Sequence, residues 1–336
     1  MYRYPFTPYP NGWYRIAYAH ELAIGEVKPI EALGRDLVAF RGEDGQVRVL
    51  DAHCPHLGAH MGYGGNVVGN DIACPFHDWR FNGQGDCVDI PYCTGKVPKR
   101  ARVDAWTVCE RNGVVFVWWD HQGREPWFEI PVVAEVGDKR WTKPLEFIWR
   151  TRVHIQEVAE NALDLAHFGK VHHYLSFPEL RSFTTEDHVL QVGLTAGRRV
   201  LGVTGKSTMD ITYHGLGVVH AQVTGPGIEL AVILTTTPVD QEHCDIHIAV
   251  MNRKSRVPLK DAVLRRYMRW EISTDFAHDI PIWEHKQYRT RPLLAKGDGP
   301  IMKVRRWAEQ FYDEEAASTE TETAAATDKT HLPLVG

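Results

Sequence analysis

The chain has 336 residues, of which 43% are apolar and 24% are charged, so it can bury a sizeable core and form two domains. Its 43 acidic and 38 basic residues give a formal charge of -5, and because the two signs are mixed along the chain we expect no nucleic-acid partner. We find neither a signal peptide nor a run of about 18 apolar residues, and therefore expect a cytoplasmic protein without a membrane span.

Short strand-like runs, separated by Gly, Asn and Asp turn residues, dominate the chain from about residue 30 to residue 120. The clearest runs are residues 36–40, 46–50, 71–76 and 114–119. They predict a small antiparallel β domain over residues 1–125. A charged, proline-containing stretch at residues 124–131 marks its end.

Helical and strand-like patterns are mixed in the second part of the chain. A strand-like segment at residues 147–155 precedes a helical pattern at residues 156–171. Two alternating segments and a long helical pattern follow, at residues 230–239, 244–252 and about 259–288. The fold class is therefore α+β, with the β domain followed by an α+β domain over residues 126–313, in which helices flank an antiparallel sheet. The Thr-, Ala- and Glu-rich residues 314–336 are expected to be a disordered tail.

Two cysteine–histidine pairs lie in the predicted β domain. Cys54 and His56 form a C-x-H motif, and after seventeen residues Cys74 and His77 form a C-x-x-H motif. Two thiolates and two imidazoles can hold a [2Fe-2S] cluster whose reduction potential is about -150 to +300 mV, which suits a centre that accepts electrons and passes them on. A Cys2His2 zinc site is the alternative, but zinc motifs seldom combine these two spacings inside a β domain.

A second group of metal-ligand residues lies in the helical pattern at residues 156–171. Glu160, Asp164 and His167 follow one another at i, i+4 and i+7, which predicts that they share one face of a helix. His172 would lie roughly 140° around the same helix. Binding one metal with both histidines therefore requires a π-bulge or a helix end between them, and Gly169 is a suitable position.

Two imidazoles and one carboxylate leave open positions on Fe(II) for dioxygen. The long helical pattern can supply the carboxylate from Asp275, Asp279 or Glu284, which spacing alone does not separate. His173 is a rival to His172. The alternative interpretation is a solvated helix face with two surface histidines.

The segments CPHLGAH and CPFHDWRFNGQG, which begin at Cys54 and Cys74, resemble the signature of Rieske proteins. With PYPNGWYRIAY, DLAHFGKVH, HDIPIWEHK and RRWAEQFY, the chain up to about Tyr312 resembles the steroid-acting Rieske non-haem iron oxygenases, a branch that includes 3-ketosteroid 9α-hydroxylase oxygenase components and cholesterol 7-desaturases. The resemblance implies that Cys54, His56, Cys74 and His77 bind the [2Fe-2S] cluster. It also implies that His167, His172 and Asp279 bind a mononuclear iron.

The same resemblance implies an assembly and an electron donor. Such oxygenases are typically head-to-tail homotrimers, in which the cluster of one subunit serves the iron of its neighbour. Asp164 would then bridge His167 and the partner subunit's His77 by hydrogen bonds. The chain carries no G-x-G-x-x-G fingerprint that opens a helix, so electrons would come from a separate NAD(P)H-dependent flavin and iron-sulfur reductase or from a ferredoxin.

We therefore expect a monooxygenase or desaturase, the terminal oxygenase component, that acts on an apolar, steroid-like small molecule with dioxygen. The same chemistry on an aromatic or amine compound, by hydroxylation, N-oxygenation or demethylation, is the first alternative. A Rieske electron-transfer protein, whose second domain only binds a partner, is the second.

Overall fold

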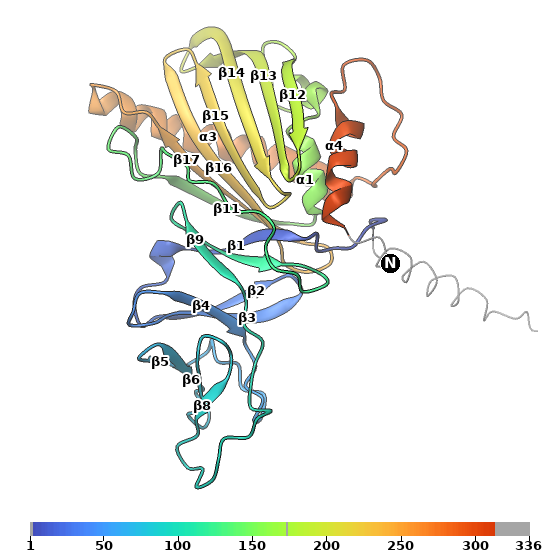
Figure 1. The fold of residues 1–336 in the computed structure, drawn as a ribbon. Helices are drawn as coiled ribbons and strands as arrows, with labels where there is room; N and C mark the ends of the chain where they lie inside the picture. The colour runs from blue at the N-terminus through green and yellow to red at the C-terminus, as the bar shows by residue number, and fades with distance from the viewer. Residues whose placement is uncertain (1–2, 173, 313–336) are drawn as a thin grey trace, which may run out of the picture.

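The computed structural model describes residues 3–172 and 174–312. The predicted tail at residues 314–336 lies outside the described residues. Three small antiparallel sheets form the lower part of the molecule in Figure 1, and a large antiparallel sheet with helices forms the upper part. This arrangement confirms the predicted α+β class.

The first part of the chain contains ten strands within the described residues. One sheet has the order β1-β10-β9 and another the order β2-β3-β4, while a third, β5-β6-β7-β8, lies at the lower end of Figure 1. The strands are β1 (Gly12–Tyr18), β2 (Val27–Ala32), β3 (Arg35–Arg41), β4 (Val47–Asp51), β5 (Asn66–Val68), β6 (Asp71–Ala73), β7 (Arg80–Phe81), β8 (Cys87–Asp89), β9 (Val108–Arg111) and β10 (Val114–Trp119), with a 3-10 turn at η1 (Ala19–Glu21). All four strand-like runs predicted here coincide with strands: β3, β4, β6 and β10.

A seven-stranded antiparallel sheet dominates the second part, in the order β11-β17-β16-β15-β14-β13-β12. Its strands are β11 (Leu145–Thr151), β12 (Glu179–Glu186), β13 (Val189–Val200), β14 (Val203–His214), β15 (Val218–Gly225), β16 (Ile228–Pro238) and β17 (Cys244–Asn252). The helices are α1 (Ile155–Asn161), α2 (Leu165–Lys170), α3 (Pro258–His285) and α4 (Ile301–Ala308), followed by η2 (Glu309–Phe311). The strand-like segments predicted at residues 147–155, 230–239 and 244–252 coincide with β11, β16 and β17.

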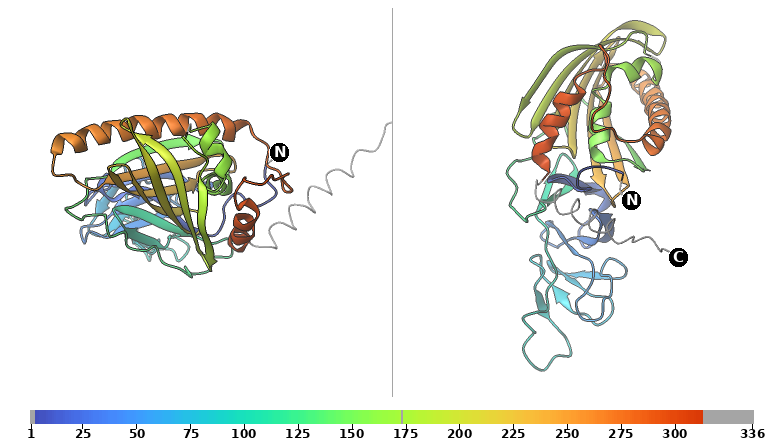
Figure 2. Two further views of the ribbon diagram at one scale, coloured as in Figure 1. Left: turned by 90° about the horizontal axis from the view of Figure 1, so that it is seen from above. Right: turned by 90° about the vertical axis from the view of Figure 1, so that its right-hand side faces the viewer.

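Helix α3 runs along the seven-stranded sheet, as Figure 2 shows from above. It begins with Pro258, whose missing N–H costs nothing in the first helical turn. Its buried residues, Leu264, Met268, Asp279 and Trp283, recur at helical spacing and therefore form one stripe. Leu264 and Met268 pack against apolar side chains of β11 and β17, including Phe147 and Ile248. Asp279 is the acid on this otherwise apolar stripe.

The single helix predicted over residues 156–171 is wrong, because two short helices, α1 and α2, replace it. Asp164 has an extended backbone (φ -78°, ψ 93°) and caps α2, where its carboxylate accepts hydrogen bonds from the N–H groups of Ala166 and His167. Aspartate favours this capping position over a helix interior, since its side chain competes for backbone donors. Glu160, Asp164 and His167 consequently do not share one helix face.

Candidate metal centres

The two cysteine–histidine loops follow the same backbone path. In each loop the cysteine N–H bonds the carbonyl five residues later, Ala59 or Trp79, at 2.9 Å. The cysteine carbonyl in turn accepts the N–H of the fourth following residue, Gly58 or Asp78. Both of these residues have positive φ, 78° and 56°, a conformation that glycine, and less readily aspartate, can adopt. The loops thus present their ligand side chains in matching ways despite the different spacing.

The four predicted cluster ligands gather at the ends of these loops. Cys54 and Cys74 are buried, and the rings of His56 and His77 lie 4.6 Å apart. The pKa of the Cys54 thiol is raised to about 11, mainly by burial and in smaller part by the neighbouring Cys74 sulfur. The Nδ1 atoms of both histidines are buried without a hydrogen-bond partner within the described residues. Two buried sulfurs beside two unsatisfied imidazole nitrogens fit the ligand set of a Rieske cluster.

Aromatic side chains cover one side of this group. The Trp79 ring stacks on the His56 ring, with centroids 4.6 Å apart and an interplanar angle of 6°. Trp79 also donates its indole N–H to the hydroxyl of Tyr92 at 2.7 Å, and Tyr92 lies within 6.5 Å of both histidine rings. These contacts hold the imidazoles in place and shield them from water.

The second group of ligands converges from α2, the residues that follow it, and α3. His167 Nε2 lies 3.1 Å from His172 Nε2, which in turn lies 3.4 Å from Asp279 Oδ2. One ligand atom from each of the three residues lies within 4.8 Å of the others. This convergence of two imidazoles and one carboxylate fits a mononuclear iron with open positions. Helix α2 ends at Lys170, one residue after Gly169, so the required helix end lies between the two histidines.

Oxygen atoms behind the two imidazoles orient them. His167 Nδ1 bonds the main-chain carbonyl of Asp164, which leaves Nε2 to face the other ligands. His172 Nδ1 faces Asp275 Oδ1 at 3.5 Å. A hydrogen-bonded partner such as the Asp164 carbonyl fixes the tautomer and the ring orientation of a metal-binding histidine, while Asp275 lies behind His172 at ion-pair distance. The Asp164 carboxylate caps α2 in the single chain, so Asp164 contacts the His167 ring through its backbone carbonyl and not through its side chain.

The pKa values of the two histidines shift in opposite directions. Burial is the main cause that lowers the pKa of His167. Burial also opposes the charged form of His172, but the carboxylates of Asp275 and Asp279 outweigh it and raise the pKa to about 9. A cation held by the Nε2 atoms and Asp279 would supply the positive charge that this carboxylate favours.

Two residues beside the iron ligands have positions that the sequence did not predict. Asn161, the last residue of α1, donates to Asp279 Oδ2 at 3.2 Å and lies 3.4 Å from His167 Nε2. Asp275, considered there only as a ligand, lies behind His172. Helical periodicity could have set Glu284 apart, because it lies roughly 140° around the helix from Asp279, but not Asp275, which lies one turn from Asp279 on the same face. Glu160 points elsewhere and forms a two-point ion pair with Arg305, and His173 lies outside the described residues.

An apolar cavity of about 120 Å³ lies between α1 and the large sheet. Ala162, which directly follows Asn161, contributes to its wall. The lining comprises Val158, Ala159, Ala162, Ile211, Tyr213, Leu216, Val219, Ala221, Val232, Leu234 and Thr236.

Comparison with known families accounts for both centres. The Rieske [2Fe-2S] domain matches residues 12–106, and the 3-ketosteroid 9α-hydroxylase C-terminal domain matches residues 117–312. A probable 3-ketosteroid-9-alpha-monooxygenase oxygenase component from Rhodococcus rhodochrous is 34% identical over 92% of this chain and 81% of the relative. The chain belongs to the Rieske oxygenases. It is therefore an oxidoreductase that carries a [2Fe-2S] cluster and a mononuclear iron, and it needs a reductase or ferredoxin as electron donor.

Other relatives of this Rieske oxygenase include cholesterol 7-desaturases. The enzyme named nvd 1 from Ciona intestinalis is 32% identical over 91% of the chain and 69% of its own length. That of Caenorhabditis elegans is 33% identical over 91% of the chain and 77% of its own length. Both parts of the chain therefore have counterparts in animals as well as in bacteria.

Solved Rieske oxygenase structures share the fold. Pseudomonas putida CBB5 NdmA with caffeine superposes with a TM-score of 0.74 at 18% identity, over 88% of this chain and 89% of that chain. Dicamba monooxygenase bound to dicamba has a TM-score of 0.70 at 21% identity, over 91% and 98%. No helix within residues 3–172 and 174–312 is long and apolar enough to cross a membrane.

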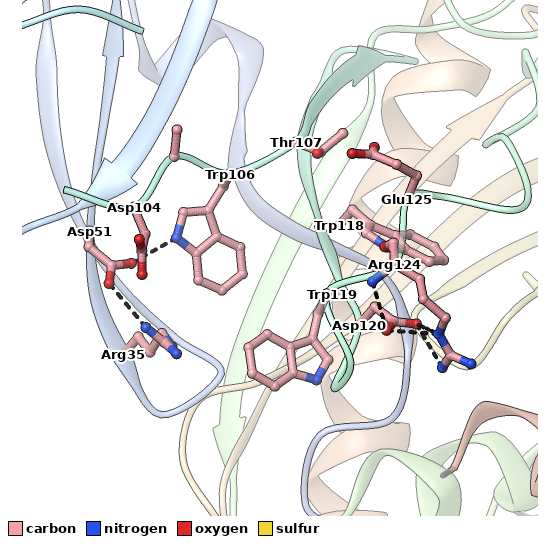
Figure 3. Close-up of a pocket in the computed structure, with 12 residues that line it drawn as sticks. Arg35, Asp51, Asp104, Trp106, Thr107, Trp118, Trp119, Asp120, Arg124 and Glu125 are labelled. Atoms are coloured by element: carbon pink, nitrogen blue, oxygen red, sulfur yellow. Dashed lines mark hydrogen bonds and ion pairs between the residues drawn. The ribbon is translucent and has the colours of Figure 1, made fainter. Parts of the chain in front are cut away.

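A polar cavity of about 320 Å³ lies apart from the metal-ligand residues, among β4, β10 and the segments that follow them (Figure 3). Asp51 accepts hydrogen bonds from Arg35 and Trp106, and Asp120 binds Arg124 through both carboxylate oxygens. These paired charges anchor Trp106 and the turn after β10. None of the residues that line the cavity is a predicted metal ligand, and we assign it no part in the reaction.

Proposed function

We propose that this Rieske oxygenase hydroxylates or desaturates an apolar, steroid-like small molecule. The observation that carries the substrate class is the apolar cavity between α1 and the large sheet, whose wall is formed almost entirely by aliphatic side chains. Relatives named for 3-ketosteroids and cholesterol, each matching more than 90% of the chain, support the same class. An apolar ligand would bury its surface there and orient itself by shape.

We assign the cluster to Cys54, His56, Cys74 and His77, and the mononuclear iron to His167, His172 and Asp279. When bound, the cluster supplies electrons and the iron activates dioxygen. Asn161 holds the Asp279 carboxylate toward the two histidines, and Asp164 and Asp275 hold the imidazole rings. The aliphatic wall at Val158, Ala162 and Leu216 excludes water from the reacting face.

The working assembly in this proposal is a head-to-tail homotrimer. Figure 1 places β5–β8, which carry the cysteine–histidine loops, at the opposite end of the molecule from α4 and the large sheet. A neighbour's cluster can instead lie beside Asp164, whose carboxylate accepts hydrogen bonds from backbone N–H groups alone within residues 3–172 and 174–312. In this arrangement the Asp164 carboxylate reaches the partner subunit's His77.

The second candidate substrate is a small aromatic or amine compound, oxidised by hydroxylation, N-oxygenation or demethylation. Its support is the volume of the apolar cavity, about 120 Å³, since ligand pockets commonly measure roughly 300 to 1,000 Å³. A fused four-ring substrate needs the cavity to widen, whereas a single ring does not.

The test of this function combines metal analysis with turnover. Iron and acid-labile sulfide are measured, and the dithionite-reduced protein is examined by EPR. Three irons and two sulfides per chain with a Rieske signal are expected. Sulfide with only two irons favours an electron carrier, and zinc without sulfide overturns the assignment. A panel from single-ring amines to 3-ketosteroids then separates the two substrate classes, and turnover of the small ring compounds alone rejects the steroid.

A further inference from the structure

The loop that follows β8 carries an unusual concentration of positive charge. Residues 91–102 read PYCTGKVPKRAR, with four cations and no acid, in a chain whose formal charge is -5. Lys96, Lys99 and Arg100 are exposed and form no ion pair within the described residues. Arg102 pairs with Asp86 at 3.9 Å. We call Lys96, Lys99 and Arg100 the basic tip.

The basic tip is connected to the cluster ligands through the start of the same loop. Tyr92 accepts the Trp79 indole N–H, and its ring lies 6.5 Å from that of His56 and 6.4 Å from that of His77. Tyr92 is itself 57% exposed. Figures 1 and 2 show the loop after β8 protruding at the end of the molecule that faces away from the large sheet. A protein that binds the exposed side of this loop can therefore lie near the cluster ligands, beside the face of His77 that the proposed trimer gives to the neighbouring subunit.

We propose that the basic tip is the docking surface for the electron donor, and that the donor presents an acidic surface. The inference rests on the proposed function, because it assumes a cluster at Cys54, His56, Cys74 and His77. Electron-transfer partners form small, short-lived interfaces. Opposite charge speeds their encounter without making the complex tight. The nearby acids do not cancel the field, since Asp86 pairs with Arg102 and Asp89 lies 3.9 Å from Arg80.

In the test, a reduced, acidic plant-type ferredoxin is mixed with the holoenzyme. The rate of cluster reduction is measured by stopped-flow absorbance at several salt concentrations. The triple variant K96E/K99E/R100E should lower the second-order rate about tenfold or more at low salt. The difference should disappear near 1 M salt, where the screening length is about 3 Å. The matched control is K260E/R266E/R269E, which makes the same change in net charge at exposed positions of α3 and should leave the rate within about twofold.

Two further measurements distinguish failure of the docking proposal from failure of the proposed function. Dithionite reduction and the EPR signal should be the same in both triple variants, which shows that the cluster is intact. If wild type lacks the Rieske signal, the proposed function fails. If the signal is present and both triple variants lower the rate of cluster reduction by ferredoxin equally, or if neither lowers it, the basic tip is not the docking surface. A basic-tip variant that changes only its oligomeric state by light scattering assigns the surface to a second copy of the chain and also overturns the proposal.

Discussion

At the scale of single residues, the iron ligands depend on neighbours that hold them. Asp279 is almost fully buried on α3, and a buried carboxylate needs hydrogen bonds or a cation to offset its lost hydration. Asn161 supplies one hydrogen bond and His172 the neighbouring charge. This environment suits an acid whose partner is a metal ion.

Replacing Asp279 should remove the mononuclear iron and spare the cluster. In Asp279→Ala we expect two irons and two sulfides per chain, an unchanged Rieske EPR signal and a turnover at least about a hundredfold below wild type. Metal analysis and substrate oxidation measure these quantities. Glu284→Ala, in the next turn of the same helix, should keep three irons. Retention of the third iron in Asp279→Ala would reject the ligand assignment.

Asp275 should act through His172 and not as a ligand. Its carboxylate lies behind the ring, at Nδ1, while Nε2 faces the other ligands. Loss of such a partner typically weakens metal affinity about 10- to 100-fold. Competition with a chelator should reveal this loss in Asp275→Ala, whereas Asp275→Asn, which can still accept a hydrogen bond, should be milder. Equal chelator resistance in wild type and Asp275→Ala would contradict the role.

At the scale of elements, the caps of the short helices α1 and α2 place the site. Asp164, at the end of the short segment between α1 and α2, caps α2, so that His167 turns toward α3. His154 caps α1, where its Nδ1 accepts the Gln156 N–H at 3.1 Å and its Nε2 lies 3.2 Å from the Thr7 carbonyl. The neutral imidazole satisfies both contacts, and protonation of Nδ1 would break the cap.

The His154 cap predicts a loss of stability in acid. Burial lowers its pKa to about 3, against about 6.5 in an unfolded chain. The unfolded state therefore binds the proton first, and stability falls as pH drops below about 6.5. From pH 7.5 to 5.0 this residue alone should cost about 2 kcal/mol. Urea unfolding at the two pH values measures the free energy of unfolding. Between them, His154→Asn, which retains a capping side chain, should lose less of this free energy than wild type. Equal losses in the two proteins would count against the role of His154.

At the scale of the whole molecule, the two sets of metal ligands lie in different parts of the chain. The cluster ligands belong to the β5–β8 region and its neighbouring loops, and the iron ligands belong to α2 and α3 (Figure 1). The proposed trimer solves this separation by pairing the centres of adjacent subunits. Each active site would then need residues from two chains.

Two inactive variants should therefore complement each other. His77→Ala removes a cluster ligand and Asp279→Ala an iron ligand, so each alone should be inactive. In mixed trimers purified after co-expression of the two variants, turnover should return to about a third of the wild-type rate, since one of the three head-to-tail interfaces joins an intact cluster to an intact iron site. Purification by two different tags and a turnover assay measure the effect, with light scattering to verify the assembly. Absence of recovery in verified mixed trimers would place electron transfer within one chain.

The sequence by itself determined the loops, strands and helix whose structure depends on residues a few positions apart. The C-x-H and C-x-x-H motifs identified the two loops, because their backbone path is set by hydrogen bonds within six residues. Short apolar runs bounded by turn residues located β3, β4 and β10, which bury consecutive side chains and therefore both of their faces. The long periodic pattern of α3 was likewise visible in the sequence.

Tertiary structure decided what depends on contacts between distant segments. The helical pattern in the sequence continues from residue 156 to residue 171. In the structure, Asp164 caps α2 and divides this segment into two helices. The hydrogen bonds from its side chain to backbone N–H groups outweigh the helix propensity of the segment. Asp279 became the acid nearest the histidines, and Asp275 their support, only when α3 packed against the sheet and α1. Asn161, 118 positions from Asp279, could not be linked to it by spacing, because the energy of such a contact comes from the folded arrangement and leaves no periodic signal in the chain.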